Sequence, residues 1–156
     1  MTDPVRVAQA VVLALHERLI TEFGGEDGLR DAGLLESALA RPMHLGAYTN
    51  PTLAELAASY AYGLIMNHPF VDGNKRIGFA VAVLFLEING CVFTAGQVDA
   101  VIQTLALAAG ALSEAAFAAW LAANTIAYSG APHLHGAARL PASGGNNAGR
   151  WGPPAR

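Results

Sequence analysis

The sequence predicts an all-α protein, a compact helical bundle around one central buried helix, with a disordered C-terminal tail. Alanine, the strongest helix former, occupies 32 of the 156 positions. Hydrophobic residues make up 53% of the chain and charged residues 13%, which is too apolar for wholesale disorder and sufficient for one hydrophobic core. Apolar residues also recur at helical spacing along most of the chain.

The first helix is predicted close to the N-terminus. Pro4 suits the first turn of a helix, with Asp3 as its cap. Apolar residues at near-helical spacing continue to Phe23, and the pair Gly24-Gly25 ends the helix.

A second helix is expected over residues 32 to about 41, with its leucines facing inward. Proline has no backbone N–H and disrupts a helix interior, so Pro42 is expected to end it. Residues 44 to 50 are then interpreted as a loop.

The third and fourth helices flank the most unusual segment of the chain. The third starts at Pro51 or Thr52 and ends before Pro69, because the residue before a proline avoids the α region. The fourth covers about residues 74 to 88, and between positions 77 and 88 its one charged residue is Glu87. A helix that is apolar on nearly every side belongs at the centre of a bundle.

The last part of the predicted domain contains a short extended piece and two helices. Val92 and Phe93 form the extended piece, and the helices cover roughly residues 95 to 109 and 113 to 124, with a break at Gly110. Residues 1–127 therefore form the expected folded domain.

The composition changes sharply at residue 128. Residues 128–156 are rich in glycine and proline and hold three arginines with no acidic residue, whereas residues 1–127 carry 6 basic and 12 acidic residues. Such a segment buries too little apolar area to offset its backbone entropy, so a flexible tail is predicted.

Several classes of protein are disfavoured by the composition. The net charge of −3 argues against a basic nucleic-acid binder. The single cysteine, Cys91, excludes an internal disulfide and a cysteine-based zinc site. No apolar stretch is long enough for a membrane span and no signal peptide is evident, so a cytoplasmic protein is expected.

The turn at residues 68–76, with sequence His-Pro-Phe-Val-Asp-Gly-Asn-Lys-Arg, concentrates the chemically versatile residues. It precedes the most apolar helix, and a helix N-terminus offers free N–H groups and positive potential to a phosphate. Lys75 and Arg76 add cationic donors, Asp72 supplies an oxygen ligand for Mg²⁺, and His68 can accept a proton from a hydroxyl. These groups suit phosphoryl or nucleotidyl transfer.

This segment resembles the signature of the Fic/Doc superfamily, H-P-F-x-D-G-N-[GK]-R. Residues 24–42 and 85–90 also resemble the corresponding parts of Doc-type ("death on curing") proteins, so the similarity covers about residues 5 to 125. Fic enzymes that transfer AMP have glycine at the position of Lys75 and a second arginine at the position of Phe79. Both differences favour the Doc branch.

The resemblance implies a toxin of a toxin–antitoxin pair, a protein kinase that phosphorylates a threonine of elongation factor Tu and blocks translation. It implies ATP and Mg²⁺ as cofactors, and a partner antitoxin of the prevent-host-death type. The sequence lacks the Ser/Thr-x-x-x-Glu-Gly/Asn motif of self-inhibited Fic enzymes, which fits restraint by a separate protein.

Transferred to this sequence, the resemblance assigns the general base to His68 and the Mg²⁺ ligand to Asp72. The phosphates of ATP are assigned to four consecutive residues, Gly73, Asn74, Lys75 and Arg76. Phe70 is expected to be a buried anchor of the loop, and the Arg76 side chain is expected to be accessible to solvent.

Two alternatives remain open at this point. The same loop supports AMP transfer to a protein hydroxyl, and the direction of the bound nucleotide decides between this and the kinase reaction. A catalytically inert binding module is the second alternative.

Outside the loop, Arg30, Asp31 and Glu36 are interpreted as structural ion pairs, and His16-Glu17 starts a zinc-protease pattern that Ile20 breaks.

Overall fold

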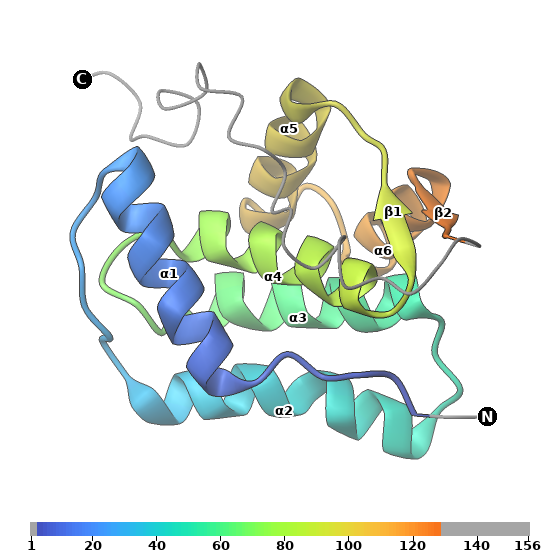
Figure 1. Ribbon diagram of the computed structural model, residues 1–156, viewed down its shortest axis with the longest axis horizontal. Helices are drawn as coiled ribbons and strands as arrows, with labels where there is room; N and C mark the ends of the chain where they lie inside the picture. Colours follow the sequence, from blue (N-terminus) through green and yellow to red (C-terminus); the bar gives the residue numbers. More distant parts are fainter. Residues whose placement is uncertain (1–2, 129–156) are drawn as a thin grey trace.

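The computed structural model describes residues 3–128, which form six α-helices and a two-stranded sheet (Figure 1). The all-α fold class is confirmed. In chain order the elements are α1 (Gln9–Phe23), α2 (Ala32–Tyr48), α3 (Leu53–Asn67), α4 (Asn74–Ile88), β1 (Cys91–Phe93), α5 (Gln97–Ala108), α6 (Glu114–Ala123) and β2 (Thr125–Ala127).

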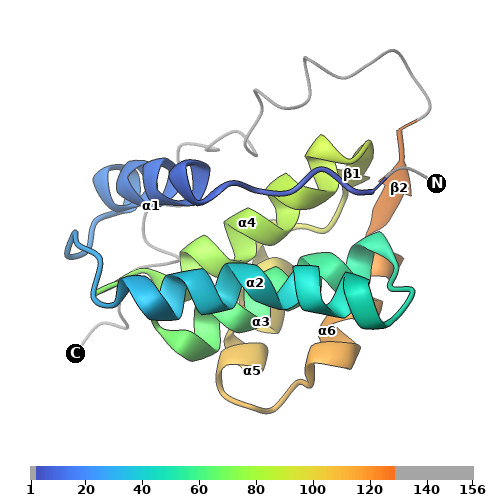
Figure 2. The ribbon, with the colours of Figure 1, turned by 90° about the horizontal axis from the view of Figure 1, so that it is seen from below.

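The helices form layers on either side of α4. Helix α3 packs against α4, α2 and α6, while α1 packs against another face of α4. Figure 2 shows α1 and α2 on opposite sides of α4, with α5 and α6 at the outer edge of the bundle. The loop of residues 68–73, which contains candidate catalytic residues, therefore connects the two innermost helices.

The centre of the bundle is a closely packed pair of helices rather than one helix. Helix α4 buries Ile77, Val81 and Phe85, as its apolar sequence predicts, but α3 is buried just as extensively. A Cβ on Gly78 would come within 2.8 Å of the Ile65 side chain, so glycine is required where α4 approaches α3. This close approach fixes the two ends of the connecting loop relative to each other.

The predicted helix start at Asp3 and Pro4 is wrong, because α1 begins only at Gln9. The residues before it run extended along the C-terminal end of α4. The Val5 N–H donates to Asn89 Oδ1 at 2.7 Å, and Asn89 Nδ2 donates to the Val5 carbonyl at 2.9 Å. The Asn89 side chain therefore satisfies the backbone in an extended conformation, and this tertiary contact overrides the capping signal.

The prediction that Pro42 ends the second helix is also wrong. Helix α2 continues through the buried Pro42 to Tyr48, so most of the loop predicted from residue 44 is helical. Proline at 42 leaves the carbonyl of Ala38 without its helical donor. That oxygen lies against Gly63 of α3, where an added Cβ would be 3.1 Å away, so glycine lets α3 approach this turn closely and packing maintains the helix.

The other element predictions are confirmed, within one or two residues at the helix ends. Helix α3 is capped by Thr52, which forms a reciprocal capping box with Glu55. The extended piece at residues 92 and 93 is β1, but its antiparallel partner β2 was not predicted. Val92 pairs with Ile126, so the end of the described chain lies beside β1.

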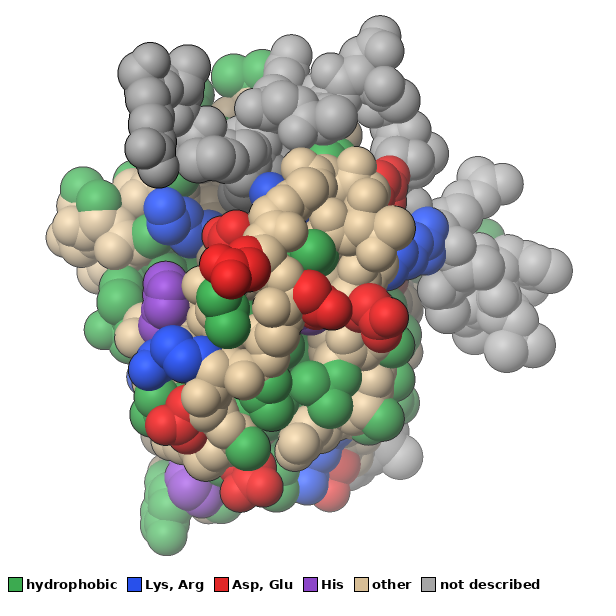
Figure 3. All heavy atoms as spheres, turned by 90° about the vertical axis from the view of Figure 1, so that its left-hand side faces the viewer, with side chains coloured by type: hydrophobic (Ala, Val, Ile, Leu, Met, Phe, Trp, Pro, Cys, Tyr) green, Lys and Arg blue, Asp and Glu red, His purple; other side chains and the backbone are tan. Residues whose placement is uncertain are grey.

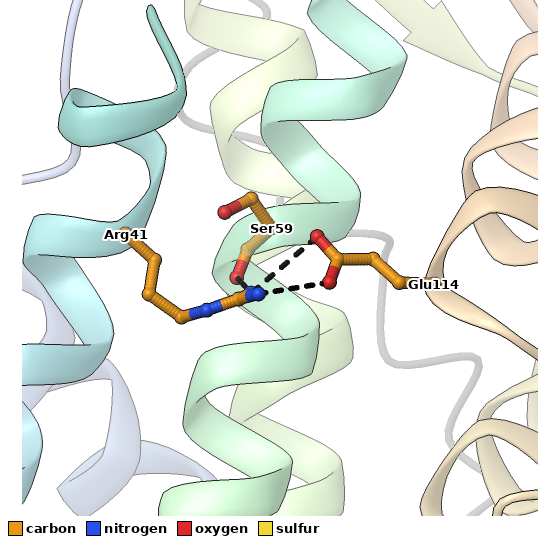
Figure 4. A network of polar contacts seen from close by, with 3 residues as sticks. All are labelled: Arg41, Ser59 and Glu114. Atoms are coloured by element: carbon orange, nitrogen blue, oxygen red, sulfur yellow. Dashed lines mark hydrogen bonds and ion pairs between the residues drawn. The ribbon is translucent and has the colours of Figure 1, made fainter. Parts of the chain in front are cut away.

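One ion pair ties the outer helices to the central pair. The Arg41 guanidinium of α2 contacts both carboxylate oxygens of Glu114 on α6, at 2.9 and 3.4 Å, and donates to the Ser59 carbonyl of α3 at 3.3 Å (Figure 4). The guanidinium also lies over the ring of Tyr62 at 4.8 Å. The bidentate geometry fixes the orientation of α6.

The predicted tail, residues 128–156, lies outside the described residues except for Tyr128. In the part of the chain that is described, no helix is both long enough and apolar enough to span a membrane.

The pH dependence of stability is expected to involve Glu87 of α4. Burial raises the pKa of this carboxyl from 4.5 to about 7. Between these two pH values the folded protein holds a proton that the unfolded chain has released, so the free energy of unfolding falls as pH rises from 4.5 toward 7. We predict that Glu87→Gln flattens this pH dependence, measured as urea midpoints at pH 5 and pH 8.

Glu36→Gln on the exposed face of α2 is the matched control, and it should keep the wild-type pH dependence. Identical pH profiles for wild type and Glu87→Gln would contradict the prediction.

Candidate active site

The candidate site is the loop between α3 and α4, residues 68–73, and a second loop lies directly against it. This second loop, residues 24–31, connects α1 and α2. The Val71 N–H donates to the Gly28 carbonyl at 3.0 Å, and the N–H groups of Arg30 and Asp31 donate to the Pro69 carbonyl at 2.7 and 3.0 Å. Leu29 and Phe70 form an antiparallel bridge between the two loops. Backbone pairing therefore holds the candidate site together before any side chain is considered.

His68 ends α3 and is exposed. Its φ of 52° is left-handed, and it is the one non-glycine residue with positive φ in the described part of the chain. Arg30 donates to the His68 carbonyl at 2.8 Å through Nε and to the Asn67 carbonyl at 3.1 Å through Nη2. Left-handed non-glycine residues are strained and concentrate at functional sites, so the backbone of His68 is held in place by its surroundings.

Asn74 holds the shape of the loop through its buried side chain. Its Oδ1 accepts from the Phe70 N–H and its Nδ2 donates to the Phe70 carbonyl, both at 3.0 Å. Phe70 is 1% exposed, so its predicted role as a buried anchor is confirmed. With both amide atoms bonded to Phe70, the group of Asn74 suited to a phosphate is its backbone N–H.

Asp72 is exposed, and each of its carboxylate oxygens accepts one backbone hydrogen bond. Oδ1 accepts from Gly73 at 2.8 Å and Oδ2 accepts from Glu26 at 3.0 Å. A Cβ on Gly25 would lie 2.8 Å from Oδ2, so glycine is needed where the second loop passes this carboxylate. The bonds orient the carboxylate, and the remaining lone pairs leave it able to bind a cation.

The N-terminus of α4 has an open first turn. Gly73 is its N-cap residue, with a φ of 77°, and neither a side-chain cap nor an acidic first-turn residue is present in this described helix. The first helical hydrogen bond runs from the Ile77 N–H to the Gly73 carbonyl. The N–H groups of Asn74, Lys75 and Arg76 come before this first bond and form the positive end of the helix dipole. The Lys75 side chain is exposed.

The expectation that Arg76 is accessible to solvent is wrong. The residue is 7% exposed, its Nη1 donates to the Gly24 carbonyl at 3.0 Å, and its guanidinium lies over the ring of Phe23 at 5.4 Å. Burial lowers the pKa of Arg76, and the nearby Asp72 charge opposes this shift. The sequence predicts only that Gly24-Gly25 ends α1, but Phe23 and Gly24 at this end also contact the Arg76 guanidinium.

His16 of α1 is a site-supporting residue that the sequence reasoning missed. It is 3% exposed, its Nε2 lies 2.8 Å from the Asp72 carbonyl, and its ring stacks on Phe70 at 3.7 Å between centroids. A signal was available, because His16 lies four residues from both Val12 and Ile20 on the buried stripe of α1. A histidine at such a position needs a polar partner inside the protein.

The predicted ion pairs near Arg30 are not formed. Arg30 donates to backbone carbonyls, and Asp31 caps α2 by accepting from the Leu34 N–H at 2.9 Å. Glu36 is exposed on α2. Among the described residues the ion pair that is formed is Arg41–Glu114, on other elements.

Charged and histidine side chains gather on the face of the molecule that carries the ends of α1 and α2 (Figure 3). Basic, acidic and histidine groups lie close together there, so the face has no single sign of charge. The exposed ionisable residues of the two loops are Glu26, Asp27, Arg30, Asp31, His68 and Asp72, with Lys75 just beyond them.

Comparison with known proteins agrees with this geometry. The sequence profile of the Fic/DOC family matches residues 6–86, slightly more than half of the chain and the part that forms both loops. The chain belongs to the Fic/DOC family. The Fic/DOC match begins just before α1 and ends within α4.

Two curated Fic/DOC relatives carry functional names. The chain is 49% identical over 70 residues to "Toxin Doc" of Mycolicibacterium smegmatis, covering 44% of this chain and 54% of that protein. It is 38% identical over 80 residues to "Protein kinase doc" of Escherichia phage P1, covering 51% of this chain and 64% of that protein. The chain thus spans about half to two thirds of the length of each relative.

The residues of the two loops fit a nucleotide phosphate with its metal. The open first turn of α4 and Lys75 supply donors for phosphate oxygens. Asp72 supplies a fixed carboxylate, and Mg²⁺ characteristically combines one or two carboxylates with phosphate oxygens and water. Arg76 can contribute to the same site through its positive charge and its backbone N–H.

The burial of Arg76 leads to a stability prediction. Arg76→Ala removes the donor to the Gly24 carbonyl and the contact with Phe23, so we expect the free energy of unfolding to fall by about 1–3 kcal/mol. Urea denaturation of the purified protein measures this change.

The control is Lys75→Ala, which alters the exposed neighbour and should change stability by no more than about 0.5 kcal/mol. Equal unfolding midpoints for Arg76→Ala and Lys75→Ala would contradict the structural role of Arg76.

Proposed function

We propose that this protein is a Doc-like toxin, a protein kinase that transfers the γ-phosphate of ATP to a hydroxyl group of a translation factor and so blocks translation. The observation that carries the proposal is the open N-terminus of α4 with Lys75 beside it, next to an exposed His68 and an oriented Asp72. The proposed target is elongation factor Tu, and the proposed site of action is the cytoplasm. Residues 1–127 form the proposed catalytic domain.

In the proposed reaction the chain's own residues position two substrates. The N–H groups of Asn74, Lys75 and Arg76 and the Lys75 ammonium bind phosphate oxygens, and the Arg76 guanidinium adds positive charge from its buried position. Gly73 allows the backbone to approach the phosphates closely, and Asp72 holds Mg²⁺, which neutralises phosphate charge when bound. His68 accepts the proton of the target hydroxyl as its oxygen forms a bond to the γ-phosphorus. The bond from that phosphorus to the bridging oxygen of the β-phosphate breaks, and ADP leaves.

The kinase reaction is favoured over AMP transfer by two positions of α4. Lys75 stands where AMP-transferring Fic enzymes have glycine, and Phe79 stands where they have a second arginine. The names of the two relatives, one a toxin and one a protein kinase, support the same branch. AMP transfer uses the same residues with the nucleotide reversed, so it is the second candidate function.

A toxin of this kind requires a partner that restrains it. The proposed partner is an antitoxin of the prevent-host-death type, which would cover the site through a helical segment. An inert binding module, the third possibility, is disfavoured because His68, Asp72 and Lys75 are all present in one loop and the helix end that follows it. Such a module has no need of a histidine held in a left-handed conformation.

The test is the intact mass of purified elongation factor Tu after incubation with this protein and Mg-ATP. We expect a gain of one phosphate. His68→Ala should abolish the gain while keeping the fold, because His68 is exposed. Parallel incubations with ATP labelled at the γ-phosphate or at adenine identify the transferred group.

A gain of one AMP, carried by the adenine label, would replace the kinase by AMP transfer with the same site residues. Unchanged mass together with growth arrest that survives His68→Ala would support the binding module and contradict both enzymatic proposals.

A further inference from the structure

Arg30 lies outside the segment of residues 68–76, but it contacts the turn that carries the proposed base, His68. His68 can act on a hydroxyl only if its backbone directs the imidazole to the side where the α4 N-terminus lies. The direction of the Cα–Cβ bond depends on the backbone conformation, and the conformation of His68 is left-handed, with a φ of 52°. An L-residue rarely adopts this conformation without external support, because its Cβ approaches the following carbonyl oxygen.

The position ends α3, where a left-handed residue is usually glycine. Glycine has no imidazole, so a catalytic histidine at this position must tolerate a conformation that glycine adopts freely. Something in the surroundings must therefore favour the left-handed state over the ordinary helical one.

Arg30 is the side chain that contacts this turn directly. Its Nε donates to the His68 carbonyl at 2.8 Å and its Nη2 donates to the Asn67 carbonyl at 3.1 Å. These carbonyls close the C-terminal end of α3, where the helix dipole is negative and favours a cation. The rigid guanidinium fork spans two successive carbonyls, which fixes their relative direction and hence the backbone turn at His68.

The base of the Arg30 side chain is itself anchored. The Arg30 N–H donates to the Pro69 carbonyl at 2.7 Å, so the same residue contacts three consecutive carbonyls, those of residues 67, 68 and 69. The next residue, Asp31, caps α2 through the Leu34 N–H. The guanidinium therefore approaches the turn from a fixed backbone and not from a free loop.

We propose that Arg30 is a positioning residue for the reaction, which holds His68 in its left-handed conformation so that the imidazole faces the hydroxyl to be phosphorylated. This inference rests on the proposed function for its catalytic consequence. Its structural part, control of the His68 backbone, is independent of the reaction.

A role in stability alone would have a different signature. Arg30 is exposed, and an exposed side chain contributes little to global stability. A positioning role instead predicts a loss in kcat with an almost unchanged KM for ATP, because residues 72–76 and not residue 30 bind the nucleotide.

The experiment compares Arg30→Ala, Arg30→Lys and a control, Arg18→Ala, which removes an exposed arginine of α1. With elongation factor Tu and Mg-ATP, Arg30→Ala should lower kcat roughly ten- to hundredfold and change the KM for ATP by less than about twofold. Arg30→Lys keeps the charge but not the fork, so its kcat should lie between those of Arg30→Ala and wild type. Arg18→Ala should match wild type.

Two further readouts distinguish positioning from instability. Guanidinium chloride at a concentration far below denaturation should partly restore kcat to Arg30→Ala and leave Arg18→Ala unchanged. A crystal structure of Arg30→Ala should show His68 with a negative φ, compared with the positive value in the wild-type protein.

Wild-type kcat in Arg30→Ala, or a left-handed His68 in its crystal structure, would overturn the proposal. If the wild-type protein transfers nothing to any target, the proposed function fails, and the φ of His68 in Arg30→Ala still decides whether Arg30 controls this turn.

Discussion

The backbone pairing between the loops at residues 24–31 and 68–73 is the constraint on which the rest of the site depends. The two loops are distant in sequence, and each alone would be a mobile connection between helices. Their hydrogen bonds, from Val71 to Gly28 and from Arg30 and Asp31 to Pro69, convert them into one rigid unit. Only then do Asp72 and Arg76 find the backbone partners that fix their side chains.

Buried polar groups restrict the two paired loops to one conformation. Asn74 uses both amide atoms on Phe70, and His16 contacts the Asp72 carbonyl from below the loop. Each of these groups is almost fully buried, so an alternative loop conformation would leave an unpaired polar atom inside the protein. The binding of a phosphate at the α4 N-terminus would then require little rearrangement, because the donors are already oriented.

The sequence predicted the fold class and the bounds of α3 and α4 because these follow from local signals. Thr52 at a capping position and the apolar run after Asn74 determine where α3 and α4 begin. The failures occurred where a distant residue decides the local structure. The Asn89 side chain pairs with the Val5 backbone ahead of α1, and Gly63 accommodates the turn around Pro42. Neither contact can be inferred from nearby sequence.

The same distinction applies to the site. A compact motif gathers His68, Asp72 and residues 73–76 in one short segment, so the candidate residues could be identified from sequence alone. Which of these residues bind a ligand and which hold the loop in place could not be predicted, because this depends on α1 and the loop of residues 24–31. The burial of Arg76 against Phe23 and Gly24, the grip of Arg30 on α3 and the position of His16 all involve residues some 37 to 56 positions away along the chain.

In the proposed function, the open N-terminus of α4 binds the phosphates of a nucleotide. Backbone amide NMR of the full chain during titration with Mg-ATP tests it most directly. Nucleotide binding at this helix end predicts saturable shifts at the amides of residues 73–76, with the amide of Gly110 in the turn after α5 unaffected. Saturable shifts confined to other parts of the protein, or no shift at residues 73–76 at saturating nucleotide, would contradict it.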